Sequence, residues 1–326
     1  MTMNAQPEVR TREVVALCTL AFLVLGSYAV ARPAIESLYL EAYGSAALPM
    51  AWLGVAIFAL IVVAVYGRFS DLYDLTTVFQ GALAVFSIVL IVLLYAADSF
   101  AQHWAVYGLY LWKDIYIVVL VEMFWSIANS VFALKSAKWL YGLFCVMGSL
   151  GGITANLSIG PLAKSIGTAN APWLVLPLFL ISAFVCAAMP RVSKKESTAA
   201  NSSSSSSDAG QDAGFLAGWS TVRKSDYLTI LLVIIALVQI VLTLVDYRYN
   251  ALLENAYPNV DERTAVIGQV YAAIDGTAMC LQLGAGLVIS ALGVGGTILT
   301  VPALLLLAII AFLISPVFLA MAVAKV

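Results

Sequence analysis

The stretch WAVYGLYLWKDIYIVVLVEMFWSIANSV, from Trp104 to Val131, decides the fold class. Only three of its residues carry a charge: Lys113, Asp114 and Glu122. The hydrocarbon core of a bilayer is about 30 Å thick, and a helix that crosses it needs about 20 mostly apolar residues, because no water is present to satisfy exposed backbone groups. The stretch is long enough and apolar enough to predict a transmembrane helix.

The composition of the whole chain extends this prediction. Of its 326 residues 63% are hydrophobic and 10% are charged, and the net charge is −2, whereas about a quarter of the residues of a soluble domain are charged. A soluble fold could not bury that much apolar surface. A chain without a basic field also has nothing to attract nucleic acid. We therefore expect an integral membrane protein whose partner is the lipid bilayer, and no nucleic-acid binding.

The same length criterion predicts nine spans, and so an all-α polytopic membrane protein. The spans cover residues 14–31, 48–66, 76–97, 104–131, 143–166, 171–190, 228–252, 265–290 and 297–321. A polar segment with the serine tract Ser202–Ser207 separates the sixth span from the seventh, and such a segment is typical of a flexible linker. The predicted domains are a six-helix bundle over residues 1–190, a serine-rich linker over 191–226 and a partial bundle of three helices over 227–326.

The lysines and arginines near and beyond the ends of the spans predict the orientation. The N-terminal tail and the loops after spans two, four, six and eight carry ten of them: Arg10, Arg12, Arg68, Lys135, Lys138, Arg191, Lys194, Lys195, Arg223 and Lys224. The opposite segments carry four: Arg32, Lys164, Arg263 and Lys325. Because cytoplasmic loops carry the excess of positive charge, we expect the N-terminus and the linker in the cytoplasm and the C-terminus outside.

Six spans, a polar cytoplasmic linker and a further set of spans are the plan of a major-facilitator permease, in which two six-helix halves rock around a central site. The segment Gly67–Asp71 lies in the predicted loop between spans two and three, where this superfamily typically has G-x-x-x-D. A tight, capped turn is an equally good interpretation of these five residues. With three spans after the linker, we expect an incomplete second half.

Span four carries polar groups that are expensive inside a membrane and that mark candidate functional residues. At about 100° per residue, Glu122 shares one face with Asn129, and we expect both in the transport path or in a hydrogen bond within the helix bundle. Lys113 points the opposite way and lies near one end of the span, so it is either a site residue or a charge that reaches the interface.

Spans seven and eight each carry a polar stripe at helical spacing. In span seven the stripe includes Gln239 and Asp246, and in span eight it includes Asp275 and Gln282. We expect these stripes to line a cavity. An alternative for Asp275 is a buried ion pair with Arg248 that ties the two helices together.

The sequence contains no set of residues that predicts an enzyme, a metal site or a cofactor. The four cysteines lie in apolar runs without metal or disulfide spacing, so we expect free thiols. The glycines of Gly148–Gly152 favour close helix packing over a phosphate loop, because no strand precedes them. Since no nucleophile, base and orienting group are apparent, we expect neither enzymatic activity nor a cofactor.

Several blocks resemble the ATP/ADP translocase family of bacteria and plastids. They are Lys113–Tyr116, Val121–Asn129, Ala137–Phe144 with the glycines that follow, Arg32 with Glu36, Val245–Tyr249, and Gly268–Tyr271 with Gln282. The resemblance implies an inner-membrane nucleotide transporter of major-facilitator type, which exchanges ATP and ADP or moves nucleotides with protons. It also implies important carboxylates at Glu122 and Asp246. The family places a lysine just after the first span, where this chain has Ile35 beside Glu36.

Reasoning from the residues alone leaves other functions open. The charges inside the predicted spans are two cations against four anions: Lys113 and Arg248 against Asp114, Glu122, Asp246 and Asp275. Such a balance favours a proton-coupled permease for another small solute. A membrane protein that does not transport, such as an assembly partner or a sensor, is a third possibility. The substrate, the coupling ion and the oligomeric state do not follow from the sequence.

Overall fold

The computed structural model describes residues 11–100, 103–132, 137–190, 226–284 and 325. The secondary structure of this part is helical, as expected for an all-α membrane protein. The helices before the linker are α1 (Thr11–Tyr43), α2 (Leu48–Leu72), α3 (Leu75–Phe100), α4 (His103–Val131), α5 (Ala137–Ile166) and α6 (Val175–Ala187), with the short 3-10 helices η1 (Ser45–Ala47) and η2 (Thr168–Leu174). After the linker come α9 (Asp226–Ala256) and the helix Val260–Gly284.

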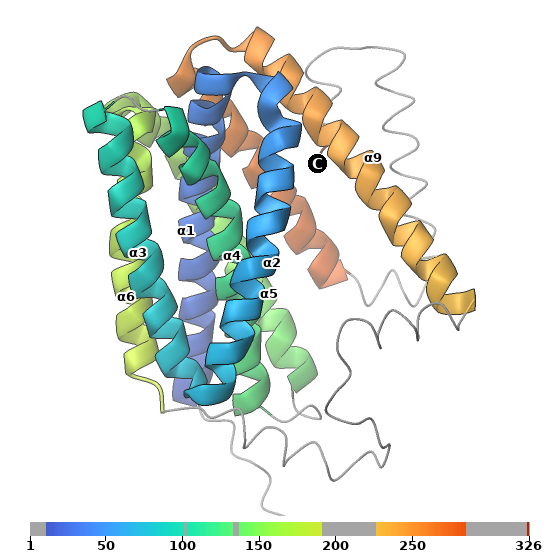
Figure 1. Cartoon of the computed structure of the whole chain (residues 1–326). Coiled ribbons are helices and arrows are strands. Elements are labelled where there is room, and N and C mark those ends of the chain that lie inside the picture. Colours follow the sequence, from blue (N-terminus) through green and yellow to red (C-terminus); the bar gives the residue numbers. More distant parts are fainter. Residues whose placement is uncertain (1–10, 101–102, 133–136, 191–225, 285–324, 326) are drawn as a thin grey trace, which may run out of the picture.

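The helices run up and down as the side-by-side bundle that Figure 1 shows. We call the end at which α1 begins the proximal end, and the end at which α1 stops at Tyr43 the distal end. Eight helices in the described residues are long and apolar enough to cross a membrane. They match the first eight predicted spans, whereas the ninth, residues 297–321, lies outside the described residues. The linker lies outside them too, and the predicted domain boundaries and orientation stay predictions.

Two details of the sequence prediction were wrong. The first span extends to Tyr43 and not to residue 31, so Arg32 lies inside a helix and not in a loop. The helix continues through Pro33, and the Arg32 guanidinium is paired with Glu36, one turn further on. The segment Gly67–Asp71, expected in a loop, belongs to the last turns of α2.

Helix α1 forms the centre of the bundle and packs against α4, α5 and α6. It is apolar on most sides, and residues such as Leu17, Leu20 and Ala31 are fully buried. A helix that is hydrophobic all round is suited to such a position. It lies closest to α5, where a Cβ atom on Gly151 would overlap the backbone of Phe22. This close approach agrees with the packing role predicted for the glycines of α5.

The helices on the two sides of the linker meet at the distal end. The contacts there are Arg263 Nη2 to Glu41 Oε2 at 2.7 Å, Ser37 Oγ to the Val260 carbonyl at 2.8 Å, Thr168 Oγ1 to Asp261 Oδ1 at 2.7 Å and the Ser45 amide to Glu254 Oε2 at 2.8 Å. Towards the proximal end α9 leans away from the bundle (Figure 1), and its side chains from Ile230 to Leu237 are mostly exposed. Its packing is therefore strongest in its last turns, where Tyr249 and Leu253 are fully buried.

Candidate functional site

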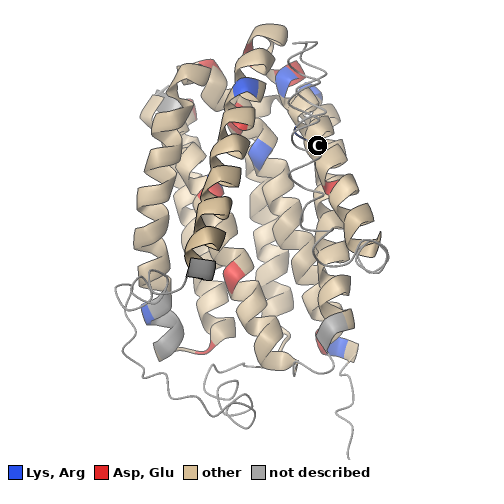
Figure 2. Cartoon of the chain, turned by 90° about the vertical axis from the view of Figure 1, so that its right-hand side faces the viewer, with Lys and Arg blue, Asp and Glu red and all other residues tan. Residues whose placement is uncertain are grey.

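Charged residues are rare along the helices, as the sparse blue and red segments in Figure 2 show. Arg32, Lys113, Asp246 and Tyr271 each lie 10 or 11 residues from the distal end of their own helix. At 1.5 Å per residue, this places all four about 16 Å below that end, which is about half the thickness of the hydrocarbon core. Four helices therefore bring polar side chains to one depth, as in transporters that bind substrate near the middle of the membrane.

Glu36 connects three of these helices. Its Oε1 atom accepts a hydrogen bond from Arg32 Nε at 2.9 Å and lies 3.6 Å from Lys113 Nζ. Its Oε2 atom accepts a hydrogen bond from the Tyr271 hydroxyl at 2.9 Å. Only 6% of Glu36 is exposed, so these contacts are made away from solvent. A buried carboxylate in this position joins α1 to α4 and to the Val260–Gly284 helix.

Lys113 is paired and buried, so the prediction that it could reach the interface was wrong. Its ammonium group donates to Asp114 Oδ1 at 2.8 Å, and that oxygen also accepts a hydrogen bond from the Tyr28 hydroxyl at 3.2 Å. With 1% of its surface exposed, Lys113 needs both neighbouring carboxylates, because an unpaired charge at this depth is expensive. The pairing holds Lys113 against α1.

Asp246 and Lys325 extend the network to α9. Lys325 Nζ lies 3.1 Å from Asp246 Oδ1 and donates to the Tyr271 hydroxyl at 3.1 Å. The contacts then run without a break from Asp114 through Lys113, Glu36, Tyr271 and Lys325 to Asp246. We call this set, together with Arg32 and Tyr28, the charged cluster. It links helices before the linker with helices after it.

Tyrosine rings support the cations of the cluster. The Arg32 guanidinium carbon lies 3.7 Å from the ring centre of Tyr271, Lys113 Nζ lies 4.0 Å from that of Tyr110, and Lys325 Nζ lies 3.9 Å from that of Tyr249. Attraction between a cation and an aromatic face is strongest where water is excluded. Each cation is therefore held by a carboxylate and a ring together.

The charges of the cluster balance, which corrects the excess of negative charge expected from the sequence. Three cations, Arg32, Lys113 and Lys325, face three anions, Glu36, Asp114 and Asp246. The sequence count placed Arg32 and Lys325 outside the spans, whereas Arg248, which it placed inside, is exposed. The sequence argument for a cation or proton site over an anion site is thereby removed.

The other predicted site residues lie outside the charged cluster. Glu122 follows Lys113 by nine residues on α4, about 13 Å along the axis, and is exposed in this chain. Asn129, also exposed, accepts a hydrogen bond from the Tyr141 hydroxyl at 2.6 Å. Gln239 and Gln282 are exposed on their helices.

Asp275 contacts α5. Its Oδ2 atom accepts a hydrogen bond from Asn156 Nδ2 at 2.9 Å, and a Cβ atom on Gly152 would overlap that carboxylate. Asp275 is therefore tied to α5 by an asparagine, and the alternative ion pair with Arg248 of α9 is not formed. Asn156 and Gly152 make room for the carboxylate between the two helices.

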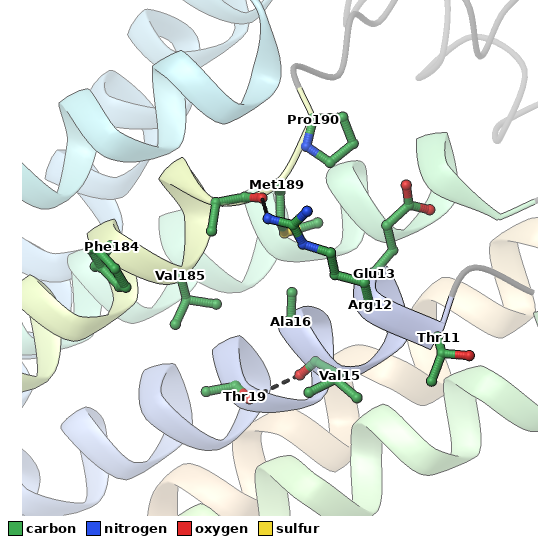
Figure 3. Close-up of a pocket in the computed structure, with 11 residues that line it drawn as sticks. Thr11, Arg12, Glu13, Val15, Ala16, Thr19, Phe184, Val185, Met189 and Pro190 are labelled. Atoms are coloured by element: carbon green, nitrogen blue, oxygen red, sulfur yellow. Dashed lines mark hydrogen bonds between the residues drawn. The ribbon is translucent and has the colours of Figure 1, made fainter.

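A pocket at the proximal end belongs to a different region. It has a volume of about 720 Å³ and lies between the start of α1 and the end of α6 (Figure 3). Arg12 points across it, and its Nη2 atom donates to the Ala188 carbonyl at 3.1 Å. None of the predicted site residues lines this pocket. Among the described residues, no group of three His, Cys, Asp or Glu side chains could hold a metal ion.

Comparison with known proteins gives the family. Residues 97–325 match the family model described as TLC ATP/ADP transporter. The chain belongs to the TLC ATP/ADP transporter family. The chain is also similar to two proteins called ADP,ATP carrier protein 1, from Chlamydia muridarum and Chlamydia trachomatis serovar D, each 24% identical to it over 194 residues. These matches cover 51% of this chain and 34% of each relative, so the chain corresponds to about a third of their length.

A solved structure confirms the fold class. The crystal structure of the nucleoside transporter NupG superposes with a TM-score of 0.62 over 96% of this chain and 77% of that chain, at 11% sequence identity. The predicted major-facilitator-like helix bundle is therefore confirmed, and so is the resemblance to the ATP/ADP translocases. The family is one of integral membrane transporters, in agreement with the predicted class of protein.

Proposed function

We propose that this member of the TLC ATP/ADP transporter family moves nucleotides across a bacterial inner membrane by alternating access, with the charged cluster as its substrate site. The observation that carries the proposal is the meeting of three cations at one depth, from both sides of the linker. A nucleotide carries several negative charges, and Arg and Lys are the side chains that bind phosphate oxygens most strongly.

The proposal gives each part of the cluster a task. Arg32, Lys113 and Lys325 bind phosphate oxygens, and the tyrosines around them hold the cations in place between transport cycles. Asp246 orients Lys325 from α9, on the far side of the linker from Arg32 and Lys113. A substrate bound to all three cations would touch both groups of helices, which is the condition for coupling its binding to their movement.

The exposed polar residues lie along the route to this site in the proposed arrangement. Glu122, Asn129, Gln239 and Gln282 line the path, and the N-terminus and the linker face the cytoplasm. The relatives are called ADP,ATP carriers, and the proposed transport mode is exchange of ADP for ATP.

Uptake into proteoliposomes tests the proposal. The purified chain should accumulate radiolabelled ATP or ADP, and nucleotide inside the vesicles should accelerate uptake if the mode is exchange. Arg32→Gln and Lys113→Gln should each lower uptake at least about tenfold, because each removes a charge that pairs with phosphate. Lys164→Gln removes an exposed lysine from α5 and is the matched control. Equal uptake by all variants would exclude the charged cluster as the site.

A further inference from the structure

Both oxygens of the Glu36 carboxylate are occupied by donors. Arg32 Nε lies 2.9 Å and Lys113 Nζ 3.6 Å from one oxygen, and the Tyr271 hydroxyl donates to the other at 2.9 Å. The residue is 6% exposed. The carboxylate therefore fills the place at which two cations and one hydroxyl group converge.

A phosphate group would need the same donors. Phosphate and carboxylate oxygens both accept short, charge-assisted hydrogen bonds from guanidinium and ammonium groups. If a phosphate took the position between Arg32 and Lys113, it would lie in contact with the Glu36 carboxylate, and the two anions would repel each other strongly at such a distance. Glu36 and a substrate phosphate therefore compete for these two cations.

We propose that Glu36 is an internal competitor of the substrate's phosphate groups, which neutralises Arg32 and Lys113 in the empty carrier and is displaced when a phosphate binds. The proposal rests on the proposed function. It gives Glu36 the opposite effect to that of a substrate ligand, because its charge lowers the affinity for the substrate. In return, the empty carrier does not leave Arg32 without a carboxylate partner inside the membrane, or Lys113 with Asp114 as its one carboxylate partner.

Displacement of Glu36 also changes a contact between helices on opposite sides of the linker. Its partner Tyr271 belongs to the Val260–Gly284 helix, whereas Glu36 itself belongs to α1. When Glu36 leaves, the Tyr271 hydroxyl loses its acceptor and keeps only the hydrogen bond that it accepts from Lys325. Binding of a phosphate to α1 and α4 thereby breaks a contact to a helix on the other side of the linker.

The variant Glu36→Gln tests the competition. Glutamine keeps the size of the side chain and carries no charge. Its amide oxygen can still accept from Arg32, while its NH2 group meets the Tyr271 hydroxyl as a donor. Equilibrium binding of radiolabelled ligands to the purified full chain in nanodiscs should become tighter by about tenfold or more for ATP and ADP, which have the most phosphate charge. The gain should be smaller for AMP and absent for adenosine.

Two controls separate competition from a general change in the protein. Glu36→Asp keeps the charge and should show no such gain. Glu262→Gln makes the same chemical change at an exposed glutamate of the Val260–Gly284 helix and should leave all four affinities unchanged. Weaker or unchanged ATP binding by Glu36→Gln would overturn the proposal, because it would mean that the Glu36 charge does not oppose the phosphates. An equal change for ATP and adenosine would also overturn it, because the effect would then not depend on phosphate.

A second variant covers the case in which Glu36→Gln fails to fold. Tyr271→Phe removes the hydroxyl that donates to Glu36 and accepts from Lys325, and the ring that faces Arg32 remains. It should produce a smaller gain in affinity, again largest for the ligands with the most phosphate groups. A gain that does not depend on the number of phosphate groups would count against competition by Glu36. Binding of inorganic pyrophosphate distinguishes the proposal about Glu36 from the proposal that the substrate is a nucleotide. If a variant bound pyrophosphate more tightly but bound no nucleotide, competition by Glu36 would be supported and nucleotides would be excluded as substrates.

Discussion

Ile35 stands where the resemblance to the ATP/ADP translocases implies a lysine, and its surroundings predict what a lysine would do there. The side chain is fully buried in the apolar core. A charge buried without a partner costs several kcal/mol, about as much as the whole stability of many domains. We expect Ile35→Lys to lower the yield of folded protein several-fold in size-exclusion chromatography, without raising nucleotide affinity.

The matched control is Ile35→Val, which should keep the yield close to that of the unmodified chain because it removes one methylene group. An Ile35→Lys protein with full yield and tighter ATP binding would contradict the expectation, since it would mean that a side chain at this position reaches the charged cluster.

Single residues show why the site could be predicted only in part. The cost of a charge inside a membrane marked Lys113 and Asp246 as candidates, but it carries no information about their partners. The partners decide the geometry: Glu36 lies on another helix from Lys113, and Lys325 lies beyond the last predicted span. Tyr28 was not predicted as a site residue because a tyrosine in an apolar run is not unusual. Its hydrogen bond to Asp114 depends on how α1 and α4 pack, which the sequence pattern does not give.

At the level of the helices, the contact between α1 and α5 gives a prediction about stability. A Cβ atom on Gly151 would overlap the backbone of Phe22, which cannot move aside as a flexible side chain could. Gly151→Ala should therefore destabilise the protein by about 1–3 kcal/mol, the range for overpacked sites. The measurement is the midpoint of thermal unfolding in detergent.

Gly142→Ala is the control for this change in the same helix. A Cβ atom there meets nothing within 4 Å, and alanine favours a helix over glycine by up to about 1 kcal/mol. We expect an unchanged or slightly raised midpoint. If both variants unfolded at the same temperature, the close approach of α1 and α5 would have to be abandoned.

The contacts at the distal end predict that movement of the helices can be blocked there. Glu41 of α1 and Arg263 of the Val260–Gly284 helix form an ion pair of 2.7 Å between helices on opposite sides of the linker. The proposed alternating access moves these groups of helices against each other, so the proposal requires the pair to open in each cycle. A chain with Glu41→Cys and Arg263→Cys, and with its four native cysteines replaced by serine, should lose uptake when a short reducible cross-linker joins the two positions. Reduction should restore it.

A cross-link within one group of helices serves as the comparison. Tyr107 of α4 donates to the Met50 carbonyl of α2 at 3.1 Å, close to the same end. Cysteines at Met50 and Tyr107 should cross-link without loss of uptake, because α2 and α4 lie on the same side of the linker. Full uptake by the cross-linked Glu41 and Arg263 pair would show that the distal end does not open.

At the scale of the whole molecule, hydropathy predicted the helices of the described residues well, because the bilayer sets both their length and their composition. It placed the first eight spans, but it ended the first of them before Arg32, since a guanidinium lowers the mean hydropathy whether or not it is paired. How the helices pack depends on small residues and on pairs of charges far apart in the chain, such as Gly151 against Phe22 and Arg263 against Glu41. These pairings cannot be read from a window of one sequence.

The orientation of the molecule gives the last prediction. The end of α6 and the start of α9 lie at the proximal end, together with the start of α1, so the linker between them starts and finishes on one side of the membrane (Figure 1). The excess of lysine and arginine on that side predicts that it is the cytoplasm. A cysteine at Ser204, in a chain without its native cysteines, should resist an impermeant thiol reagent in intact bacteria and react after the membrane is opened. A cysteine at the exposed Glu262, at the distal end, should react in intact bacteria. The reverse pattern of labelling would mean that the distal end faces the cytoplasm. The side from which a nucleotide reaches Arg32 and Lys113 would then be reversed as well.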